Sequence, residues 1–307
     1  MSKLKENKAY PYYIHGHTQD GNYSETPNPN HRSKERKKED HNFIPVIIKR
    51  NDEAVKHPDD ILEKAILEGL EQHQRPKVSL FLSSIAAGLI LGMVAISIGI
   101  VNEYSYELQN ELTKRLIKGL IYPLGFIVCL MSGNQLFTEH TATAVYPVLD
   151  KRIKKKSLFK LLTIVLAGNF LGTFLISILL YQSLPVLEIK DGLVSTFHHF
   201  INFSPSEVLF SSVIAGWLMA QSGWLILSTP PASSQLLCIY IITFLIGFGG
   251  FHHSIAGSAE IFMGLLVEGD INSYKAAVSL LTAIIGNFIG GSVFVGILNY
   301  THIRETQ

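Results

Sequence analysis

Ionisable side chains interrupt two long apolar stretches of the sequence, and these are the residues whose types could do chemistry. Glu139 lies in the first interruption, and His252, His253 and Glu260 lie in the second. An ionisable residue at the centre of a membrane span costs roughly 2.5–3.5 kcal/mol on insertion scales, so such residues are functional candidates by default. We hypothesise that His253, Glu139 and Glu260 share a proton-linked polar network. The alternatives are that the glutamates cap broken half-helices and that His253 is a buried histidine with ordinary hydrogen bonds.

Stretches without Asp, Glu, Lys or Arg must supply the helices that position these side chains. They cover residues 78–102, 119–138, 161–187, 208–259 and 276–303. Each is at least as long as the roughly 20 residues that a helix needs to cross a bilayer. The fourth stretch contains two spans, because the paired prolines and small polar residues of 228–234 cannot continue a helix. The sequence therefore predicts an all-α integral membrane protein with six transmembrane helices.

Charge separates this membrane body from the N-terminal part. Of the 307 residues 47% are apolar, yet 27 of the first 77 are charged and only 24 of the remaining 230. Residues 1–56 lack periodicity, which predicts a disordered, charged cytoplasmic tail. Residues 57–74 repeat apolar side chains at helical spacing, which predicts an amphipathic cytoplasmic helix on the membrane or on the bundle. The six-helix domain then covers residues 75–303, and 304–307 form the C-terminus.

Basic residues predict the orientation. Six of them lie in 150–160, between the second and third expected spans. Cytoplasmic loops carry an excess of Lys and Arg, so we expect a multi-pass protein of the plasma (inner) membrane with both termini in the cytoplasm. The net charge of +1 gives no reason to expect a nucleic-acid partner. Both cysteines lie in apolar runs, which excludes a disulfide framework.

Self-comparison reveals an internal repeat. Residues 83–89 resemble 211–217, and residues 168–172 resemble 286–290. Three spans are thus duplicated, and because three is odd the second copy enters the membrane from the opposite side, which gives two inverted three-helix repeats. Small residues let helices approach closely. We expect this packing role for Gly168, Gly172, Gly286 and Gly290.

The middle span of each repeat carries glycines and polar residues at mid-depth, in 133–141 and in 247–260. These clusters predict that the second and fifth helices are broken. Non-helical backbone in a membrane is tolerated only inside protein or beside a water-filled cavity. Two breaks at corresponding positions of inverted halves therefore indicate a substrate pathway.

At these residues the sequence resembles the formate/nitrite transporter family. The matching motifs are Leu136-Phe137-Thr138 in the second span, Gly250-Phe251-His252-His253-Ser254-Ile255-Ala256 in the fifth, and the two glycine motifs. The resemblance covers residues 57–303. It implies an aquaporin-like six-helix protomer, a homopentamer in the lipid bilayer with one pore per protomer, and passage of small monovalent anions or their conjugate acids.

The resemblance also implies roles for single residues. His253 matches the central histidine near the narrowest part of the pore, Leu136 and Phe137 match one of two apolar constrictions, and Thr138 supplies a loop hydroxyl. An anion in a low-dielectric constriction loses its hydration, so a proton donor that titrates near neutrality can bind it and pass it on as a neutral acid. Apolar constrictions then exclude ions that stay charged. The further candidates for the pathway are Phe251, His252, Glu139 and Glu260.

The sequence departs from the family pattern around the central histidine. His252 stands where the family commonly has Glu, Gly257 stands for an Asn, and Gly216 stands for the Asn before Trp217. Those partners orient the imidazole in typical members, so the chain resembles a divergent branch. His198 and His199, in the connection before the fourth span, are expected to be solvated.

Three other functions stay open. His252, His253 and Glu260 could ligate a metal ion in a membrane enzyme, although no His-x-x-x-His spacing is present. The same architecture could pass neutral small solutes. A non-conducting membrane scaffold or sensor could act through the charged tail. For the main hypothesis we expect no catalytic residue, no metal and no cofactor.

Overall fold

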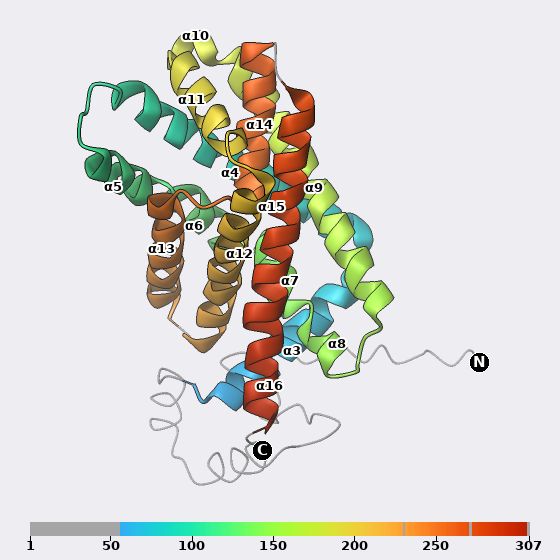
Figure 1. The fold of residues 1–307 in the computed structure, drawn as a ribbon. Coiled ribbons are helices and arrows are strands. Elements are labelled where there is room, and N and C mark those ends of the chain that lie inside the picture. The colour runs from blue at the N-terminus through green and yellow to red at the C-terminus, as the bar shows by residue number, and fades with distance from the viewer. Residues whose placement is uncertain (1–55, 230, 270–271, 306–307) are drawn as a thin grey trace.

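The computed structural model describes residues 56–229, 231–269 and 272–305, and the regular elements in these ranges are all helices (Figure 1). The predicted all-α class is confirmed. Residues 1–55, which make up almost all of the predicted tail, lie outside the described residues, as do 306–307.

Within the described ranges, five helices are long and apolar enough to cross a membrane. They are α4 (Lys77–Tyr104), α9 (Lys155–Gln182), α12 (Pro205–Ser228), α13 (Ala232–Gly249) and the C-terminal helix Ser273–Glu305, which comprises α15 (Ser273–Gly291), the π-helical segment η1 (Ser292–Ile297) and α16 (Leu298–Glu305). They correspond to the first, third, fourth and sixth predicted spans and to the first part of the fifth.

The second predicted span is divided into short helices. It consists of the end of α5 (Glu111–Ile121) followed by α6 (Pro123–Met131), α7 (Phe137–Thr143) and α8 (Tyr146–Leu149). Residues 132–136, where glycine and polar residues predict a break, are non-helical. Gly133 has a φ of +68°, a left-handed conformation that residues with a Cβ rarely adopt.

The fifth predicted span is divided in the same manner. Residues 250–253 are non-helical, and they separate α13 from α14 (Ser254–Glu268). Gly250 also has a φ of +68° and forms the left-handed cap that ends α13. The chain is therefore interrupted at both of the places where the sequence predicts a break.

Two pairs of long helices, α4 with α9 and α12 with α15, pack through small residues. A Cβ at Gly168 would lie 2.5 Å from the Cβ of Ser84, and a Cβ at Gly286 would lie 2.5 Å from that of Ser212. A Cβ at Gly290 would overlap the carbonyl of Val213. The same holds for Gly172 and the Ile85 carbonyl. Only glycine allows these backbones to approach so closely.

The connection before α12 folds back onto the bundle. It contains the short helix α10 (Leu184–Leu187) and the helix α11 (Lys190–Ile201). Leu193, Phe197 and Phe200 of α11 are buried. The rings of Phe197 and Phe200 pack against Gly264 and Gly257 of α14. The second half of the broken fifth span is thus held by α11.

The amphipathic helix α3 (Pro58–Gln74) packs on the bundle, next to α8 and α16 (Figure 1). Its buried apolar face joins residues of α8, α12 and the C-terminal helix in one cluster of Ile61, Leu62, Ala65, Ile66, Tyr146, Leu227, Val295 and Ile303. His73 adds two hydrogen bonds, from Nδ1 with the hydroxyl of Ser157 and from Nε2 with the carbonyl of Ala144, each at 3.0 Å. These bonds tie α3 to the end of α7 and the start of α9.

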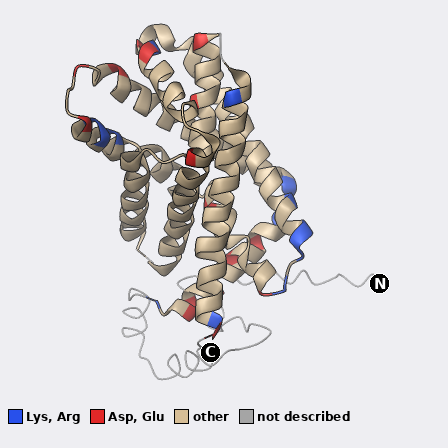
Figure 2. Ribbon diagram, in the orientation of Figure 1, with Lys and Arg blue, Asp and Glu red and all other residues tan. Residues whose placement is uncertain are grey.

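Charged residues gather toward the two ends of the bundle and in the connections (Figure 2). At the end that carries α3, Asp150 accepts hydrogen bonds from Tyr300 and Arg304 at 3.1 and 3.2 Å. Its other carboxylate oxygen lies 2.6 Å from Nε of Arg152. These contacts fasten the C-terminal helix to the connection that follows α8.

Gly290→Ala is expected to destabilise the bundle, because the new methyl group would overlap the Val213 carbonyl. Overpacking of this kind costs about 1–3 kcal/mol and occasionally more. The measurement is the thermal unfolding midpoint of the detergent-solubilised protein. Gly296→Ala is the matched control on the same C-terminal helix, because the nearest atom to its new methyl group lies at 3.6 Å. Equal changes in the two variants would contradict the close packing of α12 against α15.

Acid is expected to weaken the docking of α3. Burial lowers the pKa of His73 below its ordinary value of 6.5, and the hydrogen bond to Ala144 only partly opposes this effect. The unfolded chain then binds a proton that the folded chain resists, so the stability contributed by neutral His73 is complete above pH 6.5 and is lost as the pH falls through the folded pKa. His73→Gln should flatten the fall of the unfolding midpoint between about pH 7 and 5. An unchanged slope would rule out this contribution.

Candidate functional site

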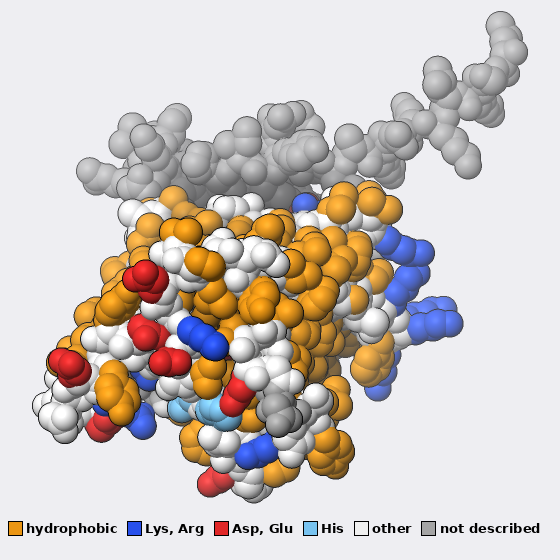
Figure 3. Space-filling model, turned by 90° about the horizontal axis from the view of Figure 1, so that it is seen from above, with side chains coloured by type: hydrophobic (Ala, Val, Ile, Leu, Met, Phe, Trp, Pro, Cys, Tyr) orange, Lys and Arg blue, Asp and Glu red, His pale blue; other side chains and the backbone are white. Residues whose placement is uncertain are grey.

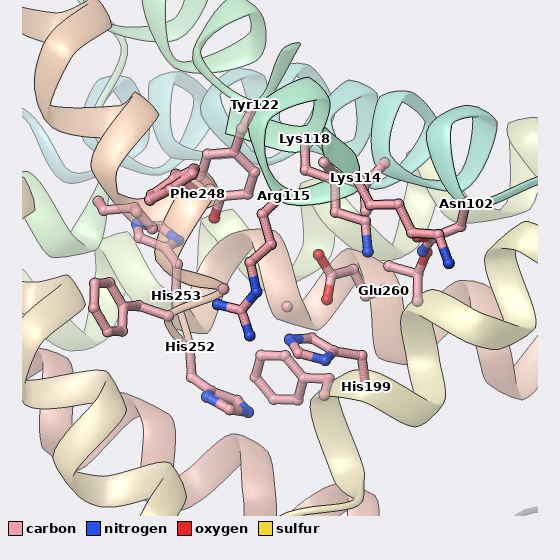
Figure 4. Close-up of a pocket in the computed structure, with 18 of the residues that line it drawn as sticks. Asn102, Lys114, Arg115, Lys118, Tyr122, His199, Phe248, His252, His253 and Glu260 are labelled. Atoms are coloured by element: carbon pink, nitrogen blue, oxygen red, sulfur yellow. The ribbon is translucent and has the colours of Figure 1, made fainter. Parts of the chain in front are cut away.

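A cavity of about 180 Å³ opens beside α11 and leads to the break between α13 and α14. Seen from the end of the bundle that carries α10 and α11, histidine side chains lie at the surface near acidic and basic ones, on a largely hydrophobic face (Figure 3). The cavity brings together four of the predicted pathway residues, namely Phe251, His252, His253 and Glu260. Figure 4 shows how α5, α11 and α14 direct their polar side chains into it.

His253 is 1% exposed and has defined partners for both ring nitrogens. The backbone N–H of Ala256 donates to Nδ1 at 3.2 Å, so His253 caps the start of α14. Because Nδ1 accepts this bond, the proton of the neutral ring resides on Nε2. Nε2 then donates to the hydroxyl of Thr138, at 2.7 Å. The edge of the Phe126 ring packs against the imidazole, with 5.0 Å between the ring centroids.

Thr138 reaches His253 because α7 begins one residue earlier, at Phe137. Leu136 and Thr138 are fully buried, and Phe137 is nearly so. Leu136 and Phe137 belong to the apolar cluster that contains Phe126. The three residues of the predicted Leu-Phe-Thr motif therefore lie beside the central histidine, between the two breaks.

The first break is held by Asn169 of α9. Its Oδ1 accepts the backbone N–H of Phe137 at 2.9 Å. Its Nδ2 donates to the carbonyls of Ser84 and Gln135, at 2.8 and 2.9 Å. One fully buried amide thus satisfies backbone groups on both sides of the start of α7 and joins them to α4.

The second break is held in the same way by Asn287 of α15. Its Oδ1 accepts the N–H of Ser254 at 2.7 Å, and its Nδ2 donates to the carbonyls of Ser212 and His252 at 2.8 and 3.0 Å. Sequence reasoning missed this role, because it assigned the two Gly-Asn motifs to helix packing alone. The available signal was an Asn at the same place in both repeats, inside helices that are otherwise apolar.

His252 lies one residue before the central histidine and faces the cavity from the other side of the break. The hydroxyl of Ser211 accepts its backbone N–H at 3.1 Å and is hydrogen-bonded to its Nδ1 at 2.9 Å. Its ring stacks on that of His199, with centroids 6.2 Å apart. His199 is exposed, as expected, and it also lines the cavity from α11.

Basic side chains of α5 form the outer wall of the cavity. Lys114, Arg115 and Lys118 line it together with Glu111 and Glu260. A hydrogen bond from Lys114 Nζ to Glu111, at 2.9 Å, holds the pKa of that carboxyl below its usual value. Sequence reasoning did not single out the residues of α5. Lys114, Arg115 and Lys118 follow Glu111 by three, four and seven residues, and this spacing, which places the four on one helix face, was the signal that could have found them.

Glu139 lies apart from this cavity. It is on α7, where its side chain faces Gly223 of α12. The described hydrogen bonds of His253 go to Thr138 and Ala256 and to neither glutamate. The three-residue polar network therefore stays a prediction, with Glu260 sharing the cavity of His253 and Glu139 outside its lining.

The neighbouring His140 is 4% exposed, and neither of its ring nitrogens has a hydrogen-bond partner among the described residues.

In the part of the chain that the structure describes, no group of three or more His, Cys, Asp or Glu residues is placed to hold a metal ion.

Known proteins are similar to this chain in sequence and in architecture. The family model "Formate/nitrite transporter" matches residues 59–301. The inner membrane protein YfdC of Escherichia coli (strain K12) is 32% identical over 247 residues, which cover 78% of this chain and 76% of that protein. A solved FNT family ion channel superposes with a TM-score of 0.69 at 18% identity, covering 80% of this chain and 99% of its own. A pentameric formate channel with formate bound gives a TM-score of 0.64 at 19% identity, with coverage of 74% and 98%.

Asn169→Asp is expected to destabilise the protein. The carboxyl group can still accept the N–H of Phe137, but at least one of the carbonyls of Ser84 and Gln135 loses its donor. A buried carbonyl left without a partner costs about 1–3 kcal/mol. The measurement is the thermal unfolding midpoint, with Asn134→Asp in the non-helical segment of the same break as the control. Equal stability of the two variants would contradict the role of the Asn169 amide in holding the first break.

Proposed function

Because this chain belongs to the formate/nitrite transporter family, we propose that it passes small monovalent anions, or their conjugate acids, through a pathway within each protomer. It is a multi-pass membrane protein of a family of channels and transporters rather than enzymes. The observation that carries the proposal is the cavity that ends at the hydrogen-bonded pair His253 and Thr138, between two helix breaks. Formate is the first solute to test, since one matched structure is a formate channel with formate bound.

The proposed protomer has six spans in two inverted repeats, with an aquaporin-like arrangement. Matching contacts support it, because each break contains a glycine at a φ of +68° and is clamped by an Asn from the last helix of its repeat. The match to a pentameric channel supports a homopentamer. The proposed membrane orientation, with both termini in the cytoplasm, places the end that carries α11 outside and the end that carries α3 inside.

The basic side chains of α5 attract the anion into the cavity, because like-signed charges in a cleft raise the local concentration of counter-ions. Further in, Phe126, Leu136 and Phe137 surround His253 and Thr138 with apolar side chains. An anion there exchanges its water for the few polar groups available, and this exchange disfavours charge. A solute that accepts a proton passes more readily than one that stays charged.

His253 and Thr138 act on the solute as a chain of hydrogen-bond donors. Nε2–H of His253 donates to the Thr138 oxygen, which leaves the hydroxyl proton free to point at an anion. A neutral ring that gave up its Nε2 proton outright would become an imidazolate, so it stabilises the anion without losing that proton. Complete transfer from the ring requires a second proton at Nδ1, which would displace the N–H of Ala256. The proton that neutralises the anion therefore comes from the bulk solution, as hydronium that reaches the cavity through its water.

Formate flux into liposomes is expected to rise as the pH falls and to depend on the hydroxyl of Thr138. Thr138→Val removes one charge-assisted hydrogen bond and should lower the flux about tenfold, since such a bond contributes about 1.5 kcal/mol. Thr138→Ser, which keeps the hydroxyl, is the matched control. His253→Ala should also lower the flux, because it removes the donor that leaves the Thr138 hydroxyl proton free for the anion.

The same assay separates the competing functions. Formate flux that His253→Ala leaves unchanged would rule out the donor chain. Flux of glycerol without flux of formate, nitrite, acetate or hydrosulfide would assign a neutral-solute channel instead. Absence of every flux would favour the non-conducting scaffold.

A further inference from the structure

The charges that line the cavity do not balance. Its basic residues are Lys114, Arg115 and Lys118, and its acidic residues are Glu111 and Glu260. Lys114 is bonded to Glu111, with Nζ and Oε1 2.9 Å apart. Lys118 is the basic residue whose charge acts on Glu260. Arg115 has neither a hydrogen bond nor an ion pair within the described ranges, so one cation of the cavity lacks an anion.

The guanidinium of Arg115 extends from α5 toward the middle of the cavity. In Figure 4 it lies among the side chains of His199, His252, His253 and Glu260, each of which comes from α11, the second break or α14. Arginine presents a planar fork of donors that matches two oxygens of one anion. A guanidinium that points into a cavity without an acceptor is therefore suited to an oxyanion that enters from outside.

His252 supplies a second donor without an acceptor in the same cavity. The residue is 4% exposed, and Ser211 occupies its Nδ1 at 2.9 Å. In the tautomer in which the Ser211 hydroxyl donates to Nδ1, the proton of the neutral ring is on Nε2. This nitrogen is buried and has no hydrogen-bond partner among the described residues, although the Phe200 backbone lies near the ring. A buried N–H without an acceptor is unfavourable, and a bound acceptor would remove that cost.

We propose that Arg115 and His252 form an outer binding site for planar anions that present two oxygens, the carboxylate class, before they reach His253. This inference rests on the proposed function and names its substrate class. A carboxylate can accept both arms of the Arg115 fork, while a linear or spherical anion accepts one bond at a time. Arg115 thus confers selectivity by geometry, and Lys114 and Lys118 contribute only attraction.

The test compares formate with azide, a linear monovalent anion of a weak acid, in liposomes that contain the full chain. Arg115→Lys keeps the charge and the helix propensity of α5 but removes the fork. It should raise the half-saturating concentration of formate about tenfold, the equivalent of one charge-assisted bond, and that of azide much less. Lys114→Gln, which removes charge alone, should raise both to a similar extent. Lys156→Gln, at the far end of the bundle, is the control for unspecific loss of charge.

Equal changes for formate and azide in Arg115→Lys would overturn the proposal while leaving anion passage intact. A second readout covers the case in which the wild-type protein carries no flux. Formate that binds the folded protein raises its unfolding midpoint in detergent. A rise that Arg115→Lys abolishes would retain the site and reject the proposed function, and a wild-type protein with neither flux nor a rise would reject both.

Discussion

Two buried amide side chains satisfy the backbone hydrogen-bonding groups at the two helix breaks in the apolar interior of this protein. A helix that stops inside a membrane leaves N–H and C=O groups that lipid cannot satisfy. Asn169 and Asn287 each satisfy one N–H and two carbonyls at such a point, with contacts of 2.7–3.0 Å. Without these contacts the breaks would be too costly to keep, and the polar residues of the breaks could not be presented to a pathway.

The amide clamps also set the geometry of the site. Asn169 fixes the start of α7, which puts the Thr138 hydroxyl in the first turn of that helix, and Asn287 fixes the start of α14, which His253 caps. The 2.7 Å contact between Thr138 and His253 therefore joins two segments that are held from different helices. Close packing at Gly172 and Gly290 keeps those helices in place.

The sequence predicts the parts of this arrangement that follow from composition and local conformation. The long uncharged stretches became helices, and the breaks lie where Gly133 and Gly250 adopt left-handed backbone. The family resemblance is confirmed, because the family model matches residues 59–301. These features were predictable because each depends on residues that are close together along the chain.

Other features depend on which elements meet in space, and there the sequence was insufficient. Arg115 was not among the predicted site residues, because nothing near it in the sequence shows that α5 and α14 line the same cavity. His199 was expected to be solvated and is exposed, but only the folded chain shows that its ring stacks on His252. The sequence also could not show that Asn169 and Asn287 each hydrogen-bond to the backbone of three residues, one of which lies on a different helix.

The cap formed by His253 couples the protonation state of its ring to the conformation of the second break. Its Nδ1 can either accept the N–H of Ala256 or hold a proton, but it cannot do both. A proton on this nitrogen would break the hydrogen bond to Ala256 and loosen the first turn of α14. Because coupling between two equilibria is reciprocal, any force that tightens this turn would in return disfavour protonation of Nδ1. The helix start and the charge of the His253 ring are thus two variables of one equilibrium, so mechanical strain on α14 would change the electrostatics of the cavity.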